Sequence, residues 1–301
     1  MMSTQALETN RMIGVAACEG APDSRCMKGP AVLYELAQQL GWFESGSSYC
    51  WDEILSLGSV VDTSSLLDLY TELSHRVERS VLAGDFVTVL GGDHSCAIGT
   101  WSGVARALAP QGDLGLVWVD AHMDAHTLDT SPSGALHGMP VSCLLGHGPE
   151  LFSHLAGADA ALKPENLCLV GVRSFEAGER DFLSALGVEV YCIDDVRRLG
   201  LKQVMQYAYE RVTQNTLGAG ITIDMDAIDP AYAPGVGSPV VGGLVAQELL
   251  DALRPLVADE QLRALEIVEF NPVMDIEQRT AKLALALVES LTRPCTAHVR
   301  H

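Results

Sequence analysis

The sequence predicts an α/β protein in which helices cover both faces of a mainly parallel sheet. Two observations support this fold class. Short, almost wholly apolar runs such as Phe86–Leu90 and Leu114–Val119 are typical of buried strands. They alternate with segments whose apolar residues recur at helical spacing, and strands buried on both faces need a layer of helices on each side. No linker separates two halves, so residues 1–301 are predicted to form one domain.

The N-terminal third begins with a predicted strand at Met12–Cys18. A helix is expected from Gly29-Pro30 to about Phe43, because proline suits the first helical turn. Ile54–Val61 is a second predicted strand. The next helix covers Ser64–Leu82, with Ser64 or Ser65 as its N-cap and Gly84 as its stop.

The remaining elements continue the alternation. Phe86–Leu90 leads through Gly91–Ser95 into a helix, and Leu114–Val119 follows. Later strands are predicted at Leu167–Val172, Val188–Ile193, Ala219–Ile223 and Leu262–Val268, and helices from near Met139, at Glu176–Leu186 and at Val196–Val212.

Composition excludes several classes of partner. The net charge of -20 argues against nucleic acid or an anionic membrane surface and is compatible with a cationic substrate. The 8 cysteines show no C-x-x-C spacing, and several lie in apolar runs, which indicates reduced thiols in a cytoplasmic protein. Met1–Asn10 lacks the features of a signal peptide, and no apolar run reaches transmembrane length.

Polar residues follow four of the predicted strands at their C-terminal ends. They are His94, Asp120, Asp224 and Glu269. In open α/β sheets, ligands bind along this edge. A shared site explains four polar strand ends more simply than packing does.

The segment Val119–His126 is rich in metal-ligand residue types. In an extended backbone, Asp120, His122 and Asp124 would point to one face, and Asp224 and Asp226 repeat that spacing on a second strand. A solvated, Asp-rich loop is the alternative for the first group, and a helix N-cap is the alternative for Asp226 or Asp229. His94 alone could likewise cap a helix, and Asp93 is expected to orient backbone.

Together, His94, Asp120, His122, Asp124, Asp224 and Asp226 offer too many ligands for one tetrahedral zinc ion. They suit two ions that share bridging carboxylates. Oxygen-rich ligation with imidazole and without thiolate favours Mn²⁺, with Fe²⁺, Co²⁺ or Ni²⁺ as possible occupants. His126 continues the alternation but is expected to support the site or contact substrate.

Six segments together resemble the arginase family of ureohydrolases, which are Mn²⁺-dependent hydrolases of guanidino compounds. They are GGDHS (91–95), VDAHMD (119–124), SGALHGMPV (133–141), IDMDAIDP (223–230), GSPVVGG (237–243) and EIVEFNP (266–272). They span most of the chain in the family's order, and the likeness is thinner before about residue 80. The resemblance implies a three-layer α/β/α sandwich.

The resemblance also implies roles for individual residues. One Mn²⁺ would be bound by His94, Asp120, Asp124 and Asp224, and the other by His122, Asp120, Asp224 and Asp226. His137 matches the family's catalytic histidine, a proton shuttle, and Glu269 matches the acid that holds the guanidinium group. Asp124 would take a proton from the attacking water. Divalent ions supply this chemistry with a nucleophile, because they can lower the pKa of bound water from 15.7 to about 7.

Substrate recognition follows less directly from the resemblance. Ser131 and Ser133 supply hydroxyls where arginases bind the α-carboxylate, and Glu176 and Glu179 match the segment that binds the α-amino group. Either acid could instead be a favourable charge at a helix N-terminus. His126 and Ala135 stand where arginases carry Asn, and Glu176 replaces Asp.

The hypothesis that follows from these matches is that the protein hydrolyses L-arginine to L-ornithine and urea. The alternatives within the family are a guanidino-acid hydrolase, an agmatinase or a formiminoglutamase. Two alternatives lie outside this activity. One is a catalytically silent family member that acts as a binding or regulatory subunit. The other is a deacetylase of related fold with one Zn²⁺, and the paired Asp224 and Asp226 argue against it, because such a site needs fewer carboxylates. The resemblance further implies a homo-oligomer, either a trimer or a hexamer.

Overall fold

Eight strands form one sheet in the computed structural model, which describes residues 9–21, 24–57 and 63–292. The strands are β1 (Asn10–Ala16), β2 (Tyr49–Ser56), β3 (Phe86–Leu90), β4 (Leu114–Val119), β5 (Leu167–Val172), β6 (Glu189–Cys192), β7 (Gly218–Asp224) and β8 (Leu262–Val268). Their spatial order is β2-β1-β3-β8-β7-β4-β5-β6, and every neighbouring pair is parallel. The predicted parallel sheet is confirmed.

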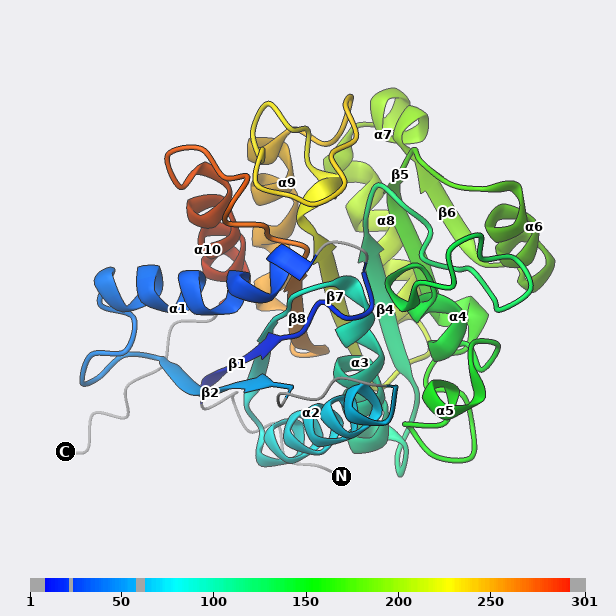
Figure 1. Cartoon of the computed structure of the whole chain (residues 1–301), viewed down its shortest axis with the longest axis horizontal. Helices are drawn as coiled ribbons and strands as arrows, with labels where there is room; N and C mark the ends of the chain where they lie inside the picture. The colour runs from blue at the N-terminus through cyan, green and yellow to red at the C-terminus, as the bar shows by residue number, and fades with distance from the viewer. Residues whose placement is uncertain (1–8, 22–23, 58–62, 293–301) are drawn as a thin grey trace.

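Helices cover both faces of this sheet (Figure 1). One layer holds α1 (Gly29–Gln39), α7 (Ile193–Leu199), α8 (Leu201–Thr213), α9 (Ala246–Leu253) and α10 (Arg279–Leu291). The other holds α2 (Thr63–Ala83), α3 (Ala97–Leu108), α4 (Pro140–Leu144), α5 (Glu150–Ser153) and α6 (Ala177–Leu186). Each layer encloses its own apolar core against the sheet, so the expected α/β/α sandwich is confirmed.

Several boundaries differ from the predicted ones. The second strand runs over Tyr49–Ser56 and so begins before Ile54; residues 58–62 lie outside the described residues. The helix expected at Val196–Val212 is two helices, because Gly200 between them has a φ of +85° that a continuous helix cannot contain. The first helix ends at Gln39 rather than Phe43.

The central strands set the position of the site. All residues of β3, β4, β5 and β7 are buried, so these strands are covered on both faces of the sheet. Because the strands are parallel, their carboxyl ends lie along one edge of the sheet. Among the described residues, no helix is both long and apolar enough to cross a membrane. The single-domain organisation of residues 1–301 stays a prediction.

Candidate metal centre

The predicted site residues come from the carboxyl ends of four neighbouring strands. His94 follows β3, Glu269 follows β8, Asp224 ends β7 and Asp120 follows β4. These strands are adjacent in the order β3-β8-β7-β4. Residues far apart in the sequence therefore meet at the centre of one sheet edge, where the sequence placed a shared site.

His94 stands at the centre of a first group of carboxylates. Its Nδ1 lies 3.2 Å from Asp120 Oδ2, 3.1 Å from Asp124 Oδ2 and 3.3 Å from Asp224 Oδ2. His94 and Asp120 are only 1% and 0% exposed. Three acceptor oxygens thus surround one buried nitrogen that can carry at most one proton.

A hydrogen-bond chain fixes which nitrogen of His94 is free. Its Nε2 lies 3.0 Å from Thr222 Oγ1, and that hydroxyl donates to Glu266 Oε2 at 2.8 Å. Because the hydroxyl proton goes to Glu266, Thr222 accepts from Nε2–H. In the neutral imidazole, Nδ1 then presents a lone pair to three carboxylates, and this buried atom has no hydrogen-bond partner. A bound cation would compensate this arrangement.

A second group shares Asp120 with the first. His122 Nδ1 lies 3.2 Å from Asp226 Oδ2 and 3.5 Å from Asp120 Oδ1. The two oxygens of Asp120 therefore face different groups, as a bridging carboxylate would. Asp226 Oδ1 is buried without a hydrogen-bond partner. His94/Asp120/Asp124 and Asp120/His122/Asp226 are each compact enough to hold one metal ion.

The electrostatics of the carboxylates also favour a cation. Burial raises the pKa of Asp224 well above its ordinary value, and that of Asp226 to about 6, and neighbouring carboxylates add to both shifts. Burial raises the pKa of Asp124 in the same way. Burial opposes ionisation of Asp120 as well, but the adjacent imidazoles of His122 and His94 outweigh it and lower the pKa of Asp120. Divalent cations would stabilise the ionised form of all four.

The convergence arises from loops rather than from the expected strand alternation. β4 ends at Val119, and Asp124 has a φ of +49°, so residues 120–124 are not an extended strand. Asp226 likewise lies in a short 3-10 helix (Met225–Ala227) after β7, whose cap is Asp224. The alternation argument was wrong in this respect, although the side chains still meet. Asp93 does orient backbone, because its Oδ1 accepts from Ser95 N at 2.9 Å.

Several supporting residues were not predicted. Trp118 Nε1 donates to Asp120 Oδ2 at 2.9 Å, and its ring stacks on His94 with a centroid separation of 4.1 Å. Arg173 Nη2 donates to the carbonyl oxygen of Asp226 at 2.7 Å. A signal for such residues exists in the sequence: Trp118 and Thr222 each precede a candidate ligand by two positions, and Glu266 is a charge inside an apolar strand.

His137 and Glu269 lie beside the two metal groups. His137 Nδ1 is 3.7 Å from Glu269 Oε1, which also accepts from His94 N at 3.0 Å. Burial lowers the pKa of His137, but the bond to Glu269 and nearby carboxylate charges outweigh it and raise the value to about 9. Glu269 has a φ of +62°, a rare backbone conformation that aims its side chain back at the site.

A cavity of about 110 Å³ connects these residues with part of the predicted substrate site. His126, Glu176 and Glu179 also line it. His126 Nε2 lies 3.1 Å from Glu176 Oε2 and 3.5 Å from Glu179 Oε2. Glu179 also accepts from Glu176 N at 3.0 Å, at the start of α6, so it serves the helix terminus as well. Ser238, to which no role was assigned, lines the same cavity.

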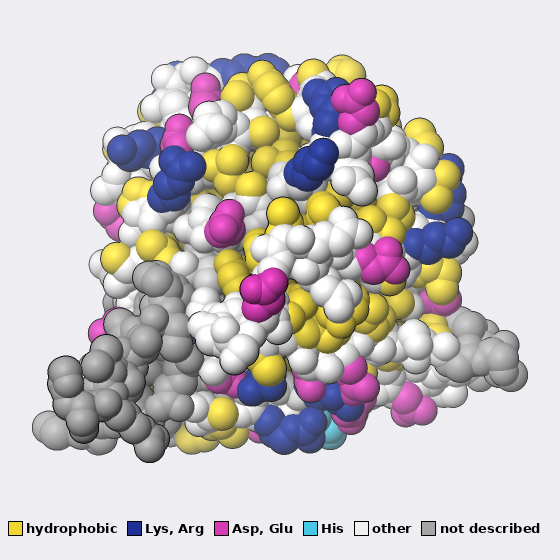
Figure 2. Space-filling model, turned by 90° about the vertical axis from the view of Figure 1, so that its left-hand side faces the viewer, with side chains coloured by type: hydrophobic (Ala, Val, Ile, Leu, Met, Phe, Trp, Pro, Cys, Tyr) yellow, Lys and Arg dark blue, Asp and Glu magenta, His cyan; other side chains and the backbone are white. Residues whose placement is uncertain are grey.

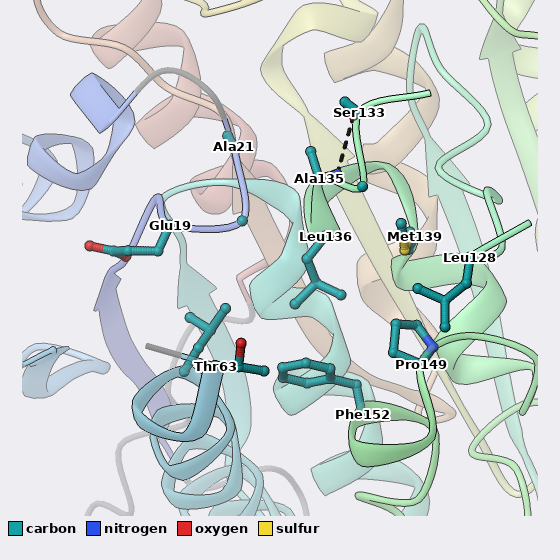
Figure 3. Close-up of a pocket in the computed structure, with 13 residues that line it drawn as sticks. Glu19, Ala21, Thr63, Leu128, Ser133, Ala135, Leu136, Met139, Pro149 and Phe152 are labelled. Carbon is teal, nitrogen blue, oxygen red and sulfur yellow. Dashed lines mark hydrogen bonds between the residues drawn. The ribbon is translucent and has the colours of Figure 1, made fainter. Parts of the chain in front are cut away.

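Ser131 and Ser133 do not line that cavity. Ser131 Oγ accepts from Gly134 N at 3.0 Å, and Ser133 Oγ accepts from Ala135 N at 3.2 Å. Ser133 instead borders a second, larger cavity of about 650 Å³, where Leu136, Met139 and Phe152 supply apolar walls (Figure 3). The structure therefore separates these two hydroxyls from the other predicted substrate contacts.

Comparison with known proteins identifies the family. The model of the arginase family matches residues 10–293. An arginase from Bacillus caldovelox is 41% identical over 220 residues, which cover 73% of each chain. The crystal structure of arginase from Bacillus subtilis superposes with a TM-score of 0.86 at 35% identity and covers 94% of this chain and 98% of that one.

A more distant solved structure extends the comparison. The arginase of Entamoeba histolytica, in complex with L-ornithine, superposes with a TM-score of 0.86 at 26% identity, covering 95% of this chain and 99% of that one. The resemblance noted in the sequence is thereby confirmed. The chain belongs to the arginase family and is a metal-dependent hydrolase that acts on guanidino compounds.

Proposed function

We propose that this protein hydrolyses L-arginine to L-ornithine and urea with a pair of Mn²⁺ ions. The observation that carries the proposal is the cavity of about 110 Å³, which is lined by Glu269 and, from a separate segment of the chain, by Glu176 and Glu179. Glu269 lies beside His137, in the part that we term the metal end, and Glu176 and Glu179 lie beside His126, in the part that we term the far end. L-arginine is cationic at both its guanidinium and its α-amino group, so each end offers a complementary charge.

The metal ions would be held by the two groups described above, with Asp224 shared between them. His94, Asp120, Asp124 and Asp224 would hold one ion, and His122, Asp120, Asp224 and Asp226 the other. The lone pair of His94 Nδ1 and the unpartnered Asp226 Oδ1 fit such ligation. Oxygen donors with imidazole and without thiolate favour Mn²⁺. When bound, the ions would supply Lewis-acid activation of water.

Glu269 would hold the substrate's guanidinium group. A carboxylate can accept two parallel, charge-assisted hydrogen bonds from a planar guanidinium. The backbone bond from His94 N fixes Glu269 Oε1, so the group is held ready rather than ordered on binding. Glu269 would thereby orient the guanidinium carbon toward the attacking water.

Asp124 and His137 would move the protons. Asp124 Oδ2, which lies 3.1 Å from His94 Nδ1, would accept a proton from the attacking water. His137, whose side chain is 29% exposed, would exchange a proton at its ring nitrogen between the departing amine and solvent. This exposure suits a shuttle, because a fully buried imidazole could not reach bulk water.

The far end of the cavity would recognise the amino-acid part of the substrate. Glu176 and Glu179 would bind the α-ammonium group of the substrate. His126 would either bind the α-carboxylate of the substrate or orient the side chains of Glu176 and Glu179. Ser131 and Ser133 would reach the carboxylate only after a change in their loop, since their hydroxyls now accept from backbone N–H groups.

A substrate panel tests the proposal. The Mn²⁺-loaded protein is assayed with arginine, agmatine, guanidinobutyrate, guanidinopropionate and formiminoglutamate, and urea or formamide release is measured. We expect the highest kcat/KM with L-arginine. A higher kcat/KM for any compound that lacks the α-amino acid end would overturn the assignment and favour another ureohydrolase.

We further propose a homo-oligomer, a trimer or a hexamer, in the cytoplasm. On the face that carries α1 and α10, apolar side chains gather among charged side chains of both signs (Figure 2). Exposed apolar residues such as Leu40 and Ile276 support burial against another copy. Light scattering of the purified protein measures the mass; a single 32.1 kDa species would contradict an oligomer.

A further inference from the structure

The carboxylate of Glu269 receives a hydrogen bond from a cysteine. Cys26 Sγ lies 3.4 Å from Glu269 Oε2, and Cys26 is only 1% exposed. Glu269 Oε1 is held by His94 N on the other side. Buried cysteines ordinarily pack as small hydrophobes, whereas this thiol faces a charged acceptor.

The thiol of Cys26 is kept in its protonated, donating form. Its hydrogen bond with Cys18, burial and the charge of Glu269 all raise the pKa of Cys26 well above its ordinary value. A thiol that stays protonated is a poor nucleophile and a poor target for oxidation. Its single S–H can be donated to Cys18 or to Glu269 Oε2, and the carboxylate is the stronger acceptor of the two.

The backbone around Cys26 is held tightly against the end of β8. Gly29, which opens α1, approaches Phe270 so closely that a Cβ there would lie 2.7 Å from the Phe270 carbonyl oxygen. Gly237 lies on the other side, where a Cβ would be 3.7 Å from Cys26 Sγ and 3.8 Å from Glu269 Oε2. The donor and its acceptor are therefore both packed closely against neighbouring backbone.

We propose that Cys26 is a positioning residue for Glu269. Its S–H holds Oε2 while His94 N holds Oε1, so the carboxylate plane is fixed before substrate arrives. A carboxylate has about four lone-pair sites, so each oxygen keeps capacity for a guanidinium N–H. This role rests on the proposed use of Glu269 to hold the guanidinium group, and it adds a residue from the N-terminal region, where the likeness to the family is thin.

The test compares Cys26→Ala and Cys26→Ser with Cys168→Ala as the matched control. Cys168 is equally buried but lies near the start of β5, away from the carboxyl edge. For each variant, kcat and KM for L-arginine, the inhibition constant of L-ornithine, Mn²⁺ content and Tm are measured. Ornithine lacks the guanidinium group that Glu269 would hold, so its inhibition constant reports mainly on the rest of the cavity.

We expect Cys26→Ala to lower kcat/KM about tenfold, because a hydrogen bond to a charged group is lost. Ornithine inhibition and Mn²⁺ content should stay unchanged, and Cys26→Ser should recover most of the activity because its hydroxyl also donates. Cys168→Ala should retain the wild-type kcat/KM.

Three results would overturn the proposal: an unchanged kcat/KM in Cys26→Ala, an equal loss of ornithine inhibition, or a serine variant as impaired as the alanine variant. If the wild-type protein prefers another guanidino compound, the same ratios are measured with that compound. In that case the arginine assignment fails while the role of Cys26 is still tested.

Discussion

The two ends of the candidate site are built differently. At the metal end, His94 and Asp120 are buried at the ends of packed strands, and Thr222 and Trp118 hold them by further hydrogen bonds. At the far end, the Glu176 side chain is 62% exposed, and its side-chain partners are His126 and Glu179. The fold thus fixes the candidate metal centre, whereas the residues proposed to determine substrate choice lie at or next to connecting segments.

Removal of the shared carboxylate should have the largest effect. Asp120→Ala is expected to lose at least one Mn²⁺ and to lower kcat by roughly a thousandfold or more, because both metal groups use Asp120 and several kcal/mol of activation are lost. Elemental analysis and urea release measure this. Retention of both ions with near-normal activity would show that Asp120 does not bridge.

Removal of the hydroxyl behind His94 should have a smaller effect. Thr222→Val breaks the bond to His94 Nε2 and should weaken Mn²⁺ affinity about 10- to 100-fold, measured by competition with a chelator. Thr88→Val is the matched control, because Thr88 lies in β3, is fully buried and has a hydroxyl without a hydrogen-bond partner. Equal losses in both variants would mean that packing, not the hydrogen bond, supports the metal.

At the far end, loss of one charge should change substrate choice but not the metal. Glu176→Gln is expected to raise KM for L-arginine several-fold. The effect is modest because an ion pair with an exposed carboxylate contributes little binding energy. Guanidinobutyrate, which lacks the α-amino group, serves as the control substrate. A parallel rise in KM for both compounds would show that Glu176 does not contact the ammonium group.

The smallest perturbation concerns the proton on His137. In the metal-free protein, its pKa should be about 9, and Glu269→Gln should lower it toward 6.5, since the paired negative charge is removed. The His137–Glu269 pair thus stabilises the metal-free fold fully at pH values below about 6.5. This contribution is lost as the pH rises through about 9, because His137 then loses its proton. An NMR titration of the imidazole protons measures both values. An identical titration in the variant would rule out the pairing.

The strands and the position of the site could be predicted from the sequence, because both depend on local apolar patterns and on where each strand ends. Continuous apolar runs identified β3, β4, β5 and β8 at their observed bounds, and strand ends then located the site. The break at Gly200 was missed because the helical spacing continues on both sides of it. The bonds from Thr222 to His94 and from Cys26 to Glu269 could not be predicted, since they depend on which strands become neighbours. The positions of the Ser131 and Ser133 hydroxyls could not be predicted either, because they depend on the conformation of the loop.

The most direct measurement is the metal content of the purified protein after Mn²⁺ loading and dialysis, determined by elemental analysis alongside urea release from L-arginine. Two separate ligand groups joined by Asp120 predict two Mn²⁺ ions per chain, both needed for full activity. A stoichiometry of one ion per chain in a fully active protein would contradict the account.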